Sequence, residues 1–261
     1  MTARVDVNTW IGSSPGLALA HPDADILARV CAREQVAGAW VGDMPSVLSE
    51  DPHERHDDLF AALKPFPMLR AAPAVHPGRE GWADAVTRAA ARGAAAISVE
   101  PIRWGLETTG AEIRALAQRC AALRLPMRLH TRLLFSFGRE TLEVFPEIGA
   151  MDITSLVRAD PNVRLIVAGA ERELIARTRA ALSPDLDSRL WWDISHIAGP
   201  PADDLAALLR MHGGAQFLYG SGWPFRLTQV PRANLELLPP DVASVSLADA
   251  DAVGAPRRNP E

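Results

Sequence analysis

Residues 95–130, AAISVEPIRWGLETTGAEIRALAQRCAALRLPMRLH, are the stretch that decides the expected fold. Short apolar runs stand at its two ends, at residues 95–100 and 127–130. Between them, over residues 111–123, apolar side chains recur every three or four positions, which is typical of a helix with one buried face. A strand, a helix and a second strand in this order predict a βαβ unit with parallel strands.

The same alternation continues along the chain in both directions. Strands are expected at residues 4–8, 38–42, 69–75, 95–100, 127–130, 163–168, 190–194 and 216–220. Helices are expected from about residue 23, at 82–92, at 111–123 and at 202–212. Eight strands separated by helices in about 250 residues predict an α/β protein, a (β/α)8 TIM barrel. A doubly wound open sheet is the alternative, but Gly12 and Gly16 lack the G-x-G-x-x-G spacing of its phosphate-binding loop.

The barrel accounts for residues 1–238 as a single domain. From residue 239 to residue 261 the chain is rich in Asp, Ala and Pro. Such a composition at a terminus predicts a C-terminal extension that is partly disordered.

The composition excludes several classes of protein. Of 261 residues, 48% are hydrophobic and 23% are charged, as in an ordinary globular chain. The 27 basic and 32 acidic side chains are spread along the sequence, which argues against a nucleic-acid partner. No stretch approaches the ~20 apolar residues of a membrane span, and the first residues lack the apolar run of a signal peptide. We therefore expect a cytoplasmic protein.

Single residue types narrow the chemistry further. Cys31 and Cys120 both fall within helical patterns, which favours buried apolar roles over a disulfide framework or a thiolate zinc site. Nearly all basic residues are arginine and alanine is abundant, a bias typical of a G+C-rich bacterial genome. Lys64 is the one lysine, so Schiff-base chemistry has a single candidate, in a segment expected to be a surface loop.

A parallel barrel carries its active site at the carboxyl ends of the strands. The polar and aromatic residues at or just after those ends are Asp6, Asn8, Trp10, Asp43, His76, Glu100, Arg103, His130, Arg132, Asp193, Ser195, His196, Ser221 and Trp223. His76 precedes a proline and is expected in a turn. His53 and His56 lie three residues apart among acidic residues, a pattern that favours a solvated surface over a metal site.

Five segments follow one another in an order typical of a known family. They are Asp6-Val-Asn-Thr-Trp-Ile-Gly12, Leu125-Pro-Met-Arg-Leu-His130-Thr131, residues 160–168, Trp192-Asp-Ile-Ser195 and Leu218-Tyr-Gly-Ser-Gly-Trp-Pro-Phe225. Together they resemble the amidohydrolase-related branch of the amidohydrolase superfamily, from about residue 5 to residue 225. The last segment is the most specific, because it is similar to the Gly-Ser-Asp-x-Pro-Phe ending of that family.

The resemblance implies one or two divalent metals, bound by two histidines of the first strand, by histidines after strands five and six, and by an aspartate after strand eight. Asn8 and Trp10 stand in place of the first pair, Ala168 or Gly169 in place of the strand-six histidine, and Gly222 in place of the aspartate. His130 alone is retained. Since catalytic zinc needs three protein ligands, the sequence predicts a degenerate metal site and no metal cofactor, with zinc as the less favoured alternative.

A rebuilt site is expected from the residues that remain. Glu100, His130 and Asp193 follow strands four, five and seven, so they can converge in one barrel mouth as a general acid–base group. The competing interpretations are a core histidine at residue 130 and a buried ion pair between Glu100 and Arg103 or Arg128.

The expected substrate is a small, carboxylated or aromatic molecule. Trp10 and Trp223 would offer flat apolar surfaces, and Trp104 follows the fourth strand. Arg103, Arg132 or Arg226 could pair with a ligand carboxylate. Asn8, His196 and Ser221 complete the expected substrate-binding residues.

Three hypotheses follow from these observations. The first is a metal-independent amidohydrolase-like hydrolase of an ester, lactone or amide, with decarboxylation or hydration within the range that the resemblance implies. The second is a metal-dependent hydrolase or decarboxylase with an unusual ligand set of His130, Asn8, Asp6 and Glu100. The third is a catalytically inactive relative, acting as a binding protein or as the partner subunit of an active homologue. A homodimer is expected from the resemblance as well.

Overall fold

The computed structural model describes residues 4–13, 22–132 and 148–254 of the chain. Its strands are β1 (Arg4–Ile11), β2 (Val36–Asp43), β3 (Leu69–Ala71), β4 (Ile97–Val99), β5 (Met127–His130), β6 (Leu165–Ala168), β7 (Leu190–Asp193) and β8 (Phe217–Leu218). All the paired strands are parallel, in two sheets with the orders β1-β2-β3 and β4-β5-β6-β7-β8.

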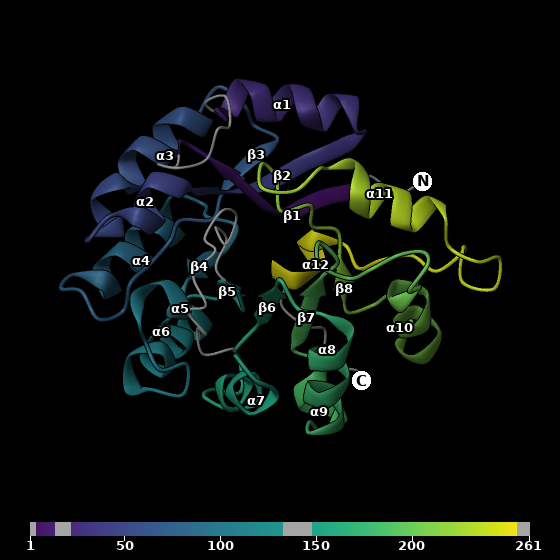
Figure 1. The fold of residues 1–261 in the computed structure, drawn as a ribbon. Coiled ribbons are helices and arrows are strands. Elements are labelled where there is room, and N and C mark those ends of the chain that lie inside the picture. The colour runs from purple at the N-terminus through teal and green to yellow at the C-terminus, as the bar shows by residue number, and fades with distance from the viewer. Residues whose placement is uncertain (1–3, 14–21, 133–147, 255–261) are drawn as a thin grey trace, which may run out of the picture.

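The two sheets meet at both of their junctions (Figure 1). An isolated bridge joins Ala74, after β3, to Ser98 of β4. At the other junction the amide of Val7 in β1 donates to the carbonyl of Tyr219, and Thr9 forms a bridge with Trp223. The strands therefore form the ring of a (β/α)8 barrel, which confirms the expected fold class.

Helices follow the strands around the outside of the ring, except α12, which packs against its floor. They are α1 (Ala24–Arg33), α2 (Met44–Leu48), α3 (His56–Leu63), α4 (Trp82–Ala91), α5 (Pro101–Trp104), α6 (Ala111–Ala122), α7 (Ala150–Val157), α8 (Arg172–Ala180), α9 (Pro184–Asp187), α10 (Asp204–His212), α11 (Gln229–Glu236) and α12 (Ala250–Gly254), with a short 3-10 helix η1 (Pro52–Arg55) before α3. None of the helices in the described part of the chain combines the length and the apolarity of a membrane span.

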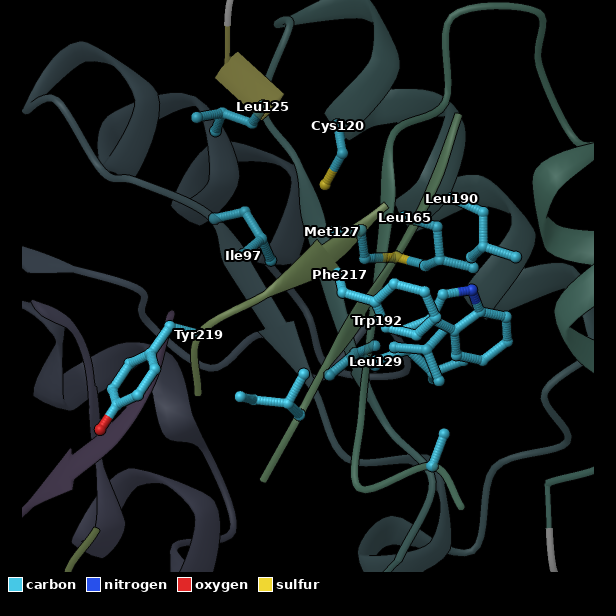
Figure 2. Packing of buried hydrophobic residues seen from close by; sticks show 14 of the residues in the cluster. Ile97, Cys120, Leu125, Met127, Leu129, Leu165, Leu190, Trp192, Phe217 and Tyr219 are labelled. Atoms are coloured by element: carbon cyan, nitrogen blue, oxygen red, sulfur yellow. The ribbon is translucent and has the colours of Figure 1, made fainter. Parts of the chain in front are cut away.

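The side chains of each strand alternate between the helices and the interior of the barrel. On β5, Met127 and Leu129 point outward into the main core, together with Phe217 of β8 (Figure 2). Cys31 and Cys120 are free and buried in this same core, as expected. Arg128 and His130 consequently point into the barrel.

The barrel floor is apolar and is closed by the C-terminal helix. Val7, Trp40 and Ile166 form a second core cluster there, to which α12 contributes Ala250 and Val253. The described part of the expected C-terminal extension, residues 239–254, is thus packed against the barrel. Residues 255–261 lie outside the described residues.

An irregularity in β1 decides which of its side chains reach the barrel mouth. Asp6 is opposite Ala39 and Thr9 is opposite Val41, so β1 has one residue more than β2 between these pairs. Such a bulge changes the alternation of side chains along a strand. Val7 can therefore pack in the floor, while Trp10 contacts His130 in the layer above.

Candidate functional site

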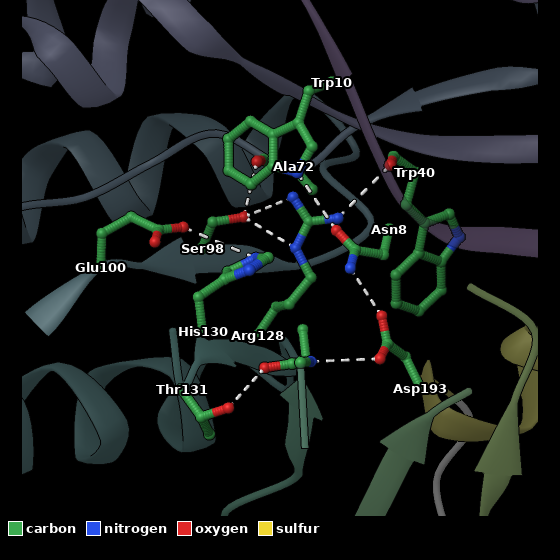
Figure 3. Close-up of polar contacts among 12 residues, drawn as sticks. Asn8, Trp10, Trp40, Ala72, Ser98, Glu100, Arg128, His130, Thr131 and Asp193 are labelled. Carbon is green, nitrogen blue, oxygen red and sulfur yellow. Dashed lines mark hydrogen bonds and ion pairs between the residues drawn. The ribbon is translucent and has the colours of Figure 1, made fainter. Parts of the chain in front are cut away.

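The centre of the mouth is a close pair formed by a histidine and a glutamate. His130 ends β5 and Glu100 directly follows the neighbouring β4, so the barrel brings the two side chains together (Figure 3). His130 Nε2 lies 3.5 Å from Glu100 Oε1, and the two side chains are 2% and 3% exposed. Within the described residues neither atom has a hydrogen-bond partner. Buried polar atoms without a hydrogen-bond partner are rare in folded proteins, and a catalytic role is one reason for such an atom to occur.

Burial favours the uncharged form of both members of this pair. It raises the pKa of Glu100 well above its ordinary value, although the nearby Arg128 charge opposes the effect. Burial, and then the Arg128 charge, lower the pKa of His130 well below its ordinary value. A carboxyl group whose protonated form is favoured by burial thus faces an imidazole whose neutral form is favoured in the same way.

Trp10 holds the imidazole of His130 in place. The two rings meet edge to face, with centroids 5.2 Å apart, and Trp10 is fully buried. The indole lies against Gly42, where a Cβ atom would approach the ring to 2.4 Å. Only a glycine at residue 42 leaves room for Trp10 in this orientation.

Asp193 belongs to a neighbouring network, and among the described residues no hydrogen bond or ion pair joins it to His130. Its carboxylate accepts hydrogen bonds from Asn8 Nδ2 at 2.6 Å and from the amide of Gly169 at 3.2 Å. Asn8 Oδ1 in turn accepts from Trp10 Nε1 at 3.1 Å. The carboxylate that the structure pairs with His130 is therefore Glu100, and Asp193 anchors Asn8.

The same carboxylate also holds Ser195, and through it His196. Ser195 Oγ lies 2.9 and 3.0 Å from the two Asp193 oxygens and 3.0 Å from His196 Nδ1. His196 is partly buried and lines a cavity of about 500 Å³. Of the expected substrate-binding residues, His196 is the one that lies at this cavity.

The remaining expected residues are distributed over the mouth and its rim. Ser221 is buried, its amide donating to Asp6 Oδ1 and its hydroxyl accepting from the amide of Trp223. Arg103 and Arg132 are exposed, and Arg132 pairs with Glu171 at 2.7 Å. In the part of the chain that the structure describes, no hydrogen bond or ion pair joins these arginines to His130 or Glu100.

Arg128 was considered from the sequence only as a partner for Glu100, yet it is the central polar residue of the barrel. It is fully buried and donates to the carbonyl of Val7 and twice to Ser98 Oγ. Its guanidinium also lies 4.9 Å from the centroid of the Trp10 ring. No ion pair joins it to Glu100 among the described residues. Arg128 lies two residues before His130 on the same strand, and side chains at that spacing point to the same face. The sequence therefore indicates that Arg128 faces the barrel interior.

The expectation of a solvated surface around His53 and His56 is wrong. His56 is 7% exposed and its Nε2 bonds the carbonyl of Ala74 at 2.8 Å. His53 Nε2 accepts from the amide of His76 at 3.2 Å, and the His76 ring stacks on Trp104. The two histidines thus attach η1 and α3 to the end of β3, a contact between distant segments that their local sequence does not show.

The residues at the expected metal positions do not suit a metal. The indole of Trp10 offers no ligand atom, Gly222 has no side chain, and both polar atoms of the Asn8 amide are already bonded. In the described ranges no group of three or more His, Cys, Asp and Glu side chains is arranged to hold an ion. The donor set therefore does not fit the divalent metal that the resemblance implies.

Comparison with known proteins gives matches in structure alone. No family model and no curated protein matches the sequence. An amidohydrolase II structure is similar with a TM-score of 0.69 at 16% identity, over 97% of this chain and 99% of that chain. A dihydroxybenzoic acid decarboxylase from Polaromonas sp. JS666, solved with manganese and the inhibitor 2-nitroresorcinol, gives a TM-score of 0.67 at 14% identity, over 97% and 95%.

A third similar structure is a probable 2-pyrone-4,6-dicarboxylic acid hydrolase from Acinetobacter baumannii, solved with citric acid. Its TM-score is 0.61 at 9% identity, over 90% of this chain and 91% of that chain. At such low sequence identities these similarities establish the fold but not the chemistry, which must be argued from the residues of the site. The chain has the fold of these structures over 90% or more of its length.

Proposed function

We propose that this chain is an amidohydrolase-related enzyme that acts on a small carboxylated or aromatic molecule without a metal ion. Hydrolysis of an ester, lactone or amide is the leading reaction. The observation that carries the proposal is a pair of buried atoms, His130 Nε2 and Glu100 Oε1, 3.5 Å apart at the carboxyl ends of β5 and β4. Neither has a hydrogen-bond partner among the described residues.

The two groups have complementary roles in such a reaction. Neutral His130 accepts a proton from the attacking water as general base, and protonated Glu100 donates one to the leaving oxygen or nitrogen. A separation of 3.5 Å leaves no room for a molecule between the two atoms, so in the proposed reaction the two side chains separate before water and substrate enter. General acid–base catalysis of this kind contributes about 10²–10⁴-fold to a rate.

The arginines at the rim support a carboxylated substrate. Arg132 shares Glu171 at an exposed ion pair, and Arg103 is exposed on α5 after β4. Exposed guanidinium groups can bind a carboxylate with two parallel hydrogen bonds. The molecules named with the similar structures are in keeping with this class, since dihydroxybenzoic acid, 2-pyrone-4,6-dicarboxylic acid and citric acid all carry carboxyl groups.

Asn8 and Trp10 act by holding their neighbours. Both are buried, and they connect Asp193 to the ring that fixes His130. In the proposed enzyme they orient His130 and shape the inner wall of the substrate site. The alternative ligand set of His130, Asn8, Asp6 and Glu100 has less support, because Asn8 and Asp6 are already bonded within the protein.

A catalytically inactive binding protein or partner subunit is the second candidate function. The near-complete burial of Glu100, His130 and Asp193 favours it, since a reactive group must be reached by its substrate. We propose a homodimer as well, as the assembly in which such an inactive binding protein would act.

The test is turnover by protein that has been depleted of metal with a chelator. A panel of carboxylated aryl esters, lactones and amides, with 2-pyrone-4,6-dicarboxylate and dihydroxybenzoate, covers hydrolysis and decarboxylation. The native protein, His130→Gln, Glu100→Gln and the exposed control Glu112→Gln are compared at equal folded concentration. Turnover that survives chelation and is lost in the first two variants supports the enzyme. Ligand binding without turnover supports the second candidate instead.

A further inference from the structure

Arg226 carries a guanidinium group that is unpaired within the described part of the chain. Its Nε atom is buried and has no hydrogen-bond partner there. The ion pairs found among the described residues do not include Arg226 either. Buried N–H groups in folded proteins are normally bonded, so an orphaned one requires an explanation. A ligand that binds at this side chain is such an explanation.

The backbone after β8 places Arg226 at the mouth of the barrel. The amide of Arg226 donates to the carbonyl of Gly222 at 3.2 Å, and the amide of Gly222 donates to the carbonyl of Asn8 in β1 at 2.9 Å. These two hydrogen bonds join the segment at the carboxyl end of β8 to β1. In a (β/α)8 barrel substrates bind at this end of the strands.

The side chain of Arg226 lies over Gly222. A Cβ atom at residue 222 would approach Arg226 Cδ to 3.2 Å and Cγ to 3.5 Å, and the φ of +70° also favours glycine there. Gly222 is the residue that stands in place of the aspartate implied by the family resemblance. Glycine at this position leaves room for the arginine and offers no carboxylate to pair with it.

The acidic residues of the nearby cavity do not supply a counter-charge for Arg226. Three of them line the cavity beside His196, and they are Glu171, Glu173 and Asp204. Each forms an ion pair with another arginine, and these partners are Arg132, Arg177 and Arg172 in the same order. The charges of the lining carboxylates are therefore already balanced.

The charge of Arg226 reaches the cavity through His196. Burial lowers the pKa of His196, Asp193 raises it, and the charges of Arg226 and Arg132 lower it further, while Glu171 raises it. Arg132 is balanced by Glu171 at 2.7 Å. Arg226 therefore adds an uncompensated positive charge near His196, which favours a ligand with a negative group.

The other two arginines of the rim lack this combination of burial and a missing partner. The side chain of Arg132 is 46% exposed and is held by Glu171. Arg103 is exposed on α5. In the described ranges neither of them has a buried donor atom without a partner. Arg226 is therefore the rim arginine best suited to hold a ligand.

The chemistry of a guanidinium group indicates which anion fits. Its Nε–H and one Nη–H point in parallel and match the two oxygens of a carboxylate. One unpaired guanidinium balances the single charge of that group. A phosphate group carries nearly two charges and would need a second cation.

We propose that Arg226 binds the carboxylate of the substrate at the barrel mouth, with its Nε–H and an Nη–H donating to the two oxygens. This deepens the proposed function, on which it rests, because it assigns recognition of the carboxylate to one residue and to the β8 side of the mouth. Arg226 then determines specificity, whereas His130 and Glu100 carry out the proton transfers.

The test compares the binding of benzoate with that of benzamide, and of succinate with that of succinamide, by isothermal titration calorimetry. Native protein is expected to bind at least one of the carboxylates about tenfold more tightly than its amide, since hydrogen bonds to charged groups are the stronger ones. Arg226→Gln removes the charge and should make the two affinities equal. Arg226→Lys keeps the charge without the parallel N–H groups and should retain part of the preference.

Arg124→Gln is the matched control, because Arg124 is exposed just before β5, at the opposite end of the barrel. It should keep the native preference, and circular dichroism with a thermal melt confirms that each variant is folded. A native protein that prefers neither carboxylate over its amide overturns the proposal, and so does an unchanged preference in Arg226→Gln. Because binding is measured without turnover, either result leaves the test of His130 and Glu100 standing.

Discussion

Arg128 Nη1, on β5, donates a hydrogen bond of 2.6 Å to the carbonyl oxygen of Val7, on β1. In a ring of eight strands these two strands face each other, so the guanidinium crosses the barrel interior (Figure 3). Val7 O is available because the bulge in β1 interrupts the regular ladder at this point. The buried cation therefore ties β1, β4 and β5 together below the His130–Glu100 pair.

The first prediction concerns the stability that this cation provides. Arg128→Met removes the donors to Val7 O and Ser98 Oγ and leaves these acceptors unpaired. We expect a loss of about 3 kcal/mol or more in the free energy of unfolding, measured with urea. Arg128→Lys keeps the charge and part of the bonding and should lose less. Equal losses in the two variants would show that packing of the side chain, and not its charge, is what matters.

A second prediction tests the close approach of Trp10 and Gly42. Gly42→Ala places a Cβ atom about where the indole ring lies, and overpacking of this kind typically costs about 1–3 kcal/mol. In a Trp10→Leu background the same substitution should cost clearly less, because the smaller side chain leaves room. Gly149→Ala is the control, since its nearest atom would be 3.5 Å away. Equal costs in both backgrounds would contradict the described packing.

How much of this site could be predicted from the sequence depends on what fixes each residue. The alternation of strands and helices predicts the barrel. The strand-end positions of Glu100, His130 and Asp193 predict that they converge, but leave open which of the two carboxylates pairs with His130. Arg128 could have been found as well, since period two places it on the same face as His130. The bulge in β1 could not be predicted, because the sequence of apolar residues does not show where one strand has an extra residue relative to its neighbour.

The burial of His53 and His56, which follow β2, could not be predicted either, and the reason is different. His53 and His56 sit among charged residues, which locally favour exposure, and only their bonds to His76 and Ala74 bury them. Tertiary contacts here override the local pattern. In the same way the Asp-rich sequence before residue 250 gives no sign of the packing of Val253 in the barrel floor.

The third prediction is a loss of stability in acid caused by His53. Burial lowers its pKa to about 4, whereas in the unfolded chain it is near 6.5. Between these values the unfolded state binds the extra proton, so the contribution of His53 to stability falls as pH falls from about 6.5 to about 4. His53→Gln keeps an acceptor for the amide of His76 and should flatten this part of the curve. Urea unfolding at several pH values gives the comparison.

The fourth prediction has the opposite sign and concerns Asp6. Burial raises its pKa to about 7 from 3.8, although its bonds to Ser221 and Asn8 oppose the shift. Between these values the folded state binds the extra proton, so the contribution of Asp6 to stability falls as pH rises from about 4 to about 7. Asp6→Asn retains an oxygen acceptor for both backbone amides and should remove this loss. A variant with the same pH dependence as the native protein would show that Asp6 is ionised throughout.

The measurement that tests the central claim most directly is turnover of the substrate panel by chelator-treated protein, compared with Glu100→Gln. A metal-independent acid–base pair predicts an unchanged rate after metal removal and a loss of about 10²-fold or more in the variant, with its fold intact. A rate that disappears on chelation and returns with manganese would contradict the account. So would a Glu100→Gln variant as active as the native protein, or no turnover of any compound in the panel.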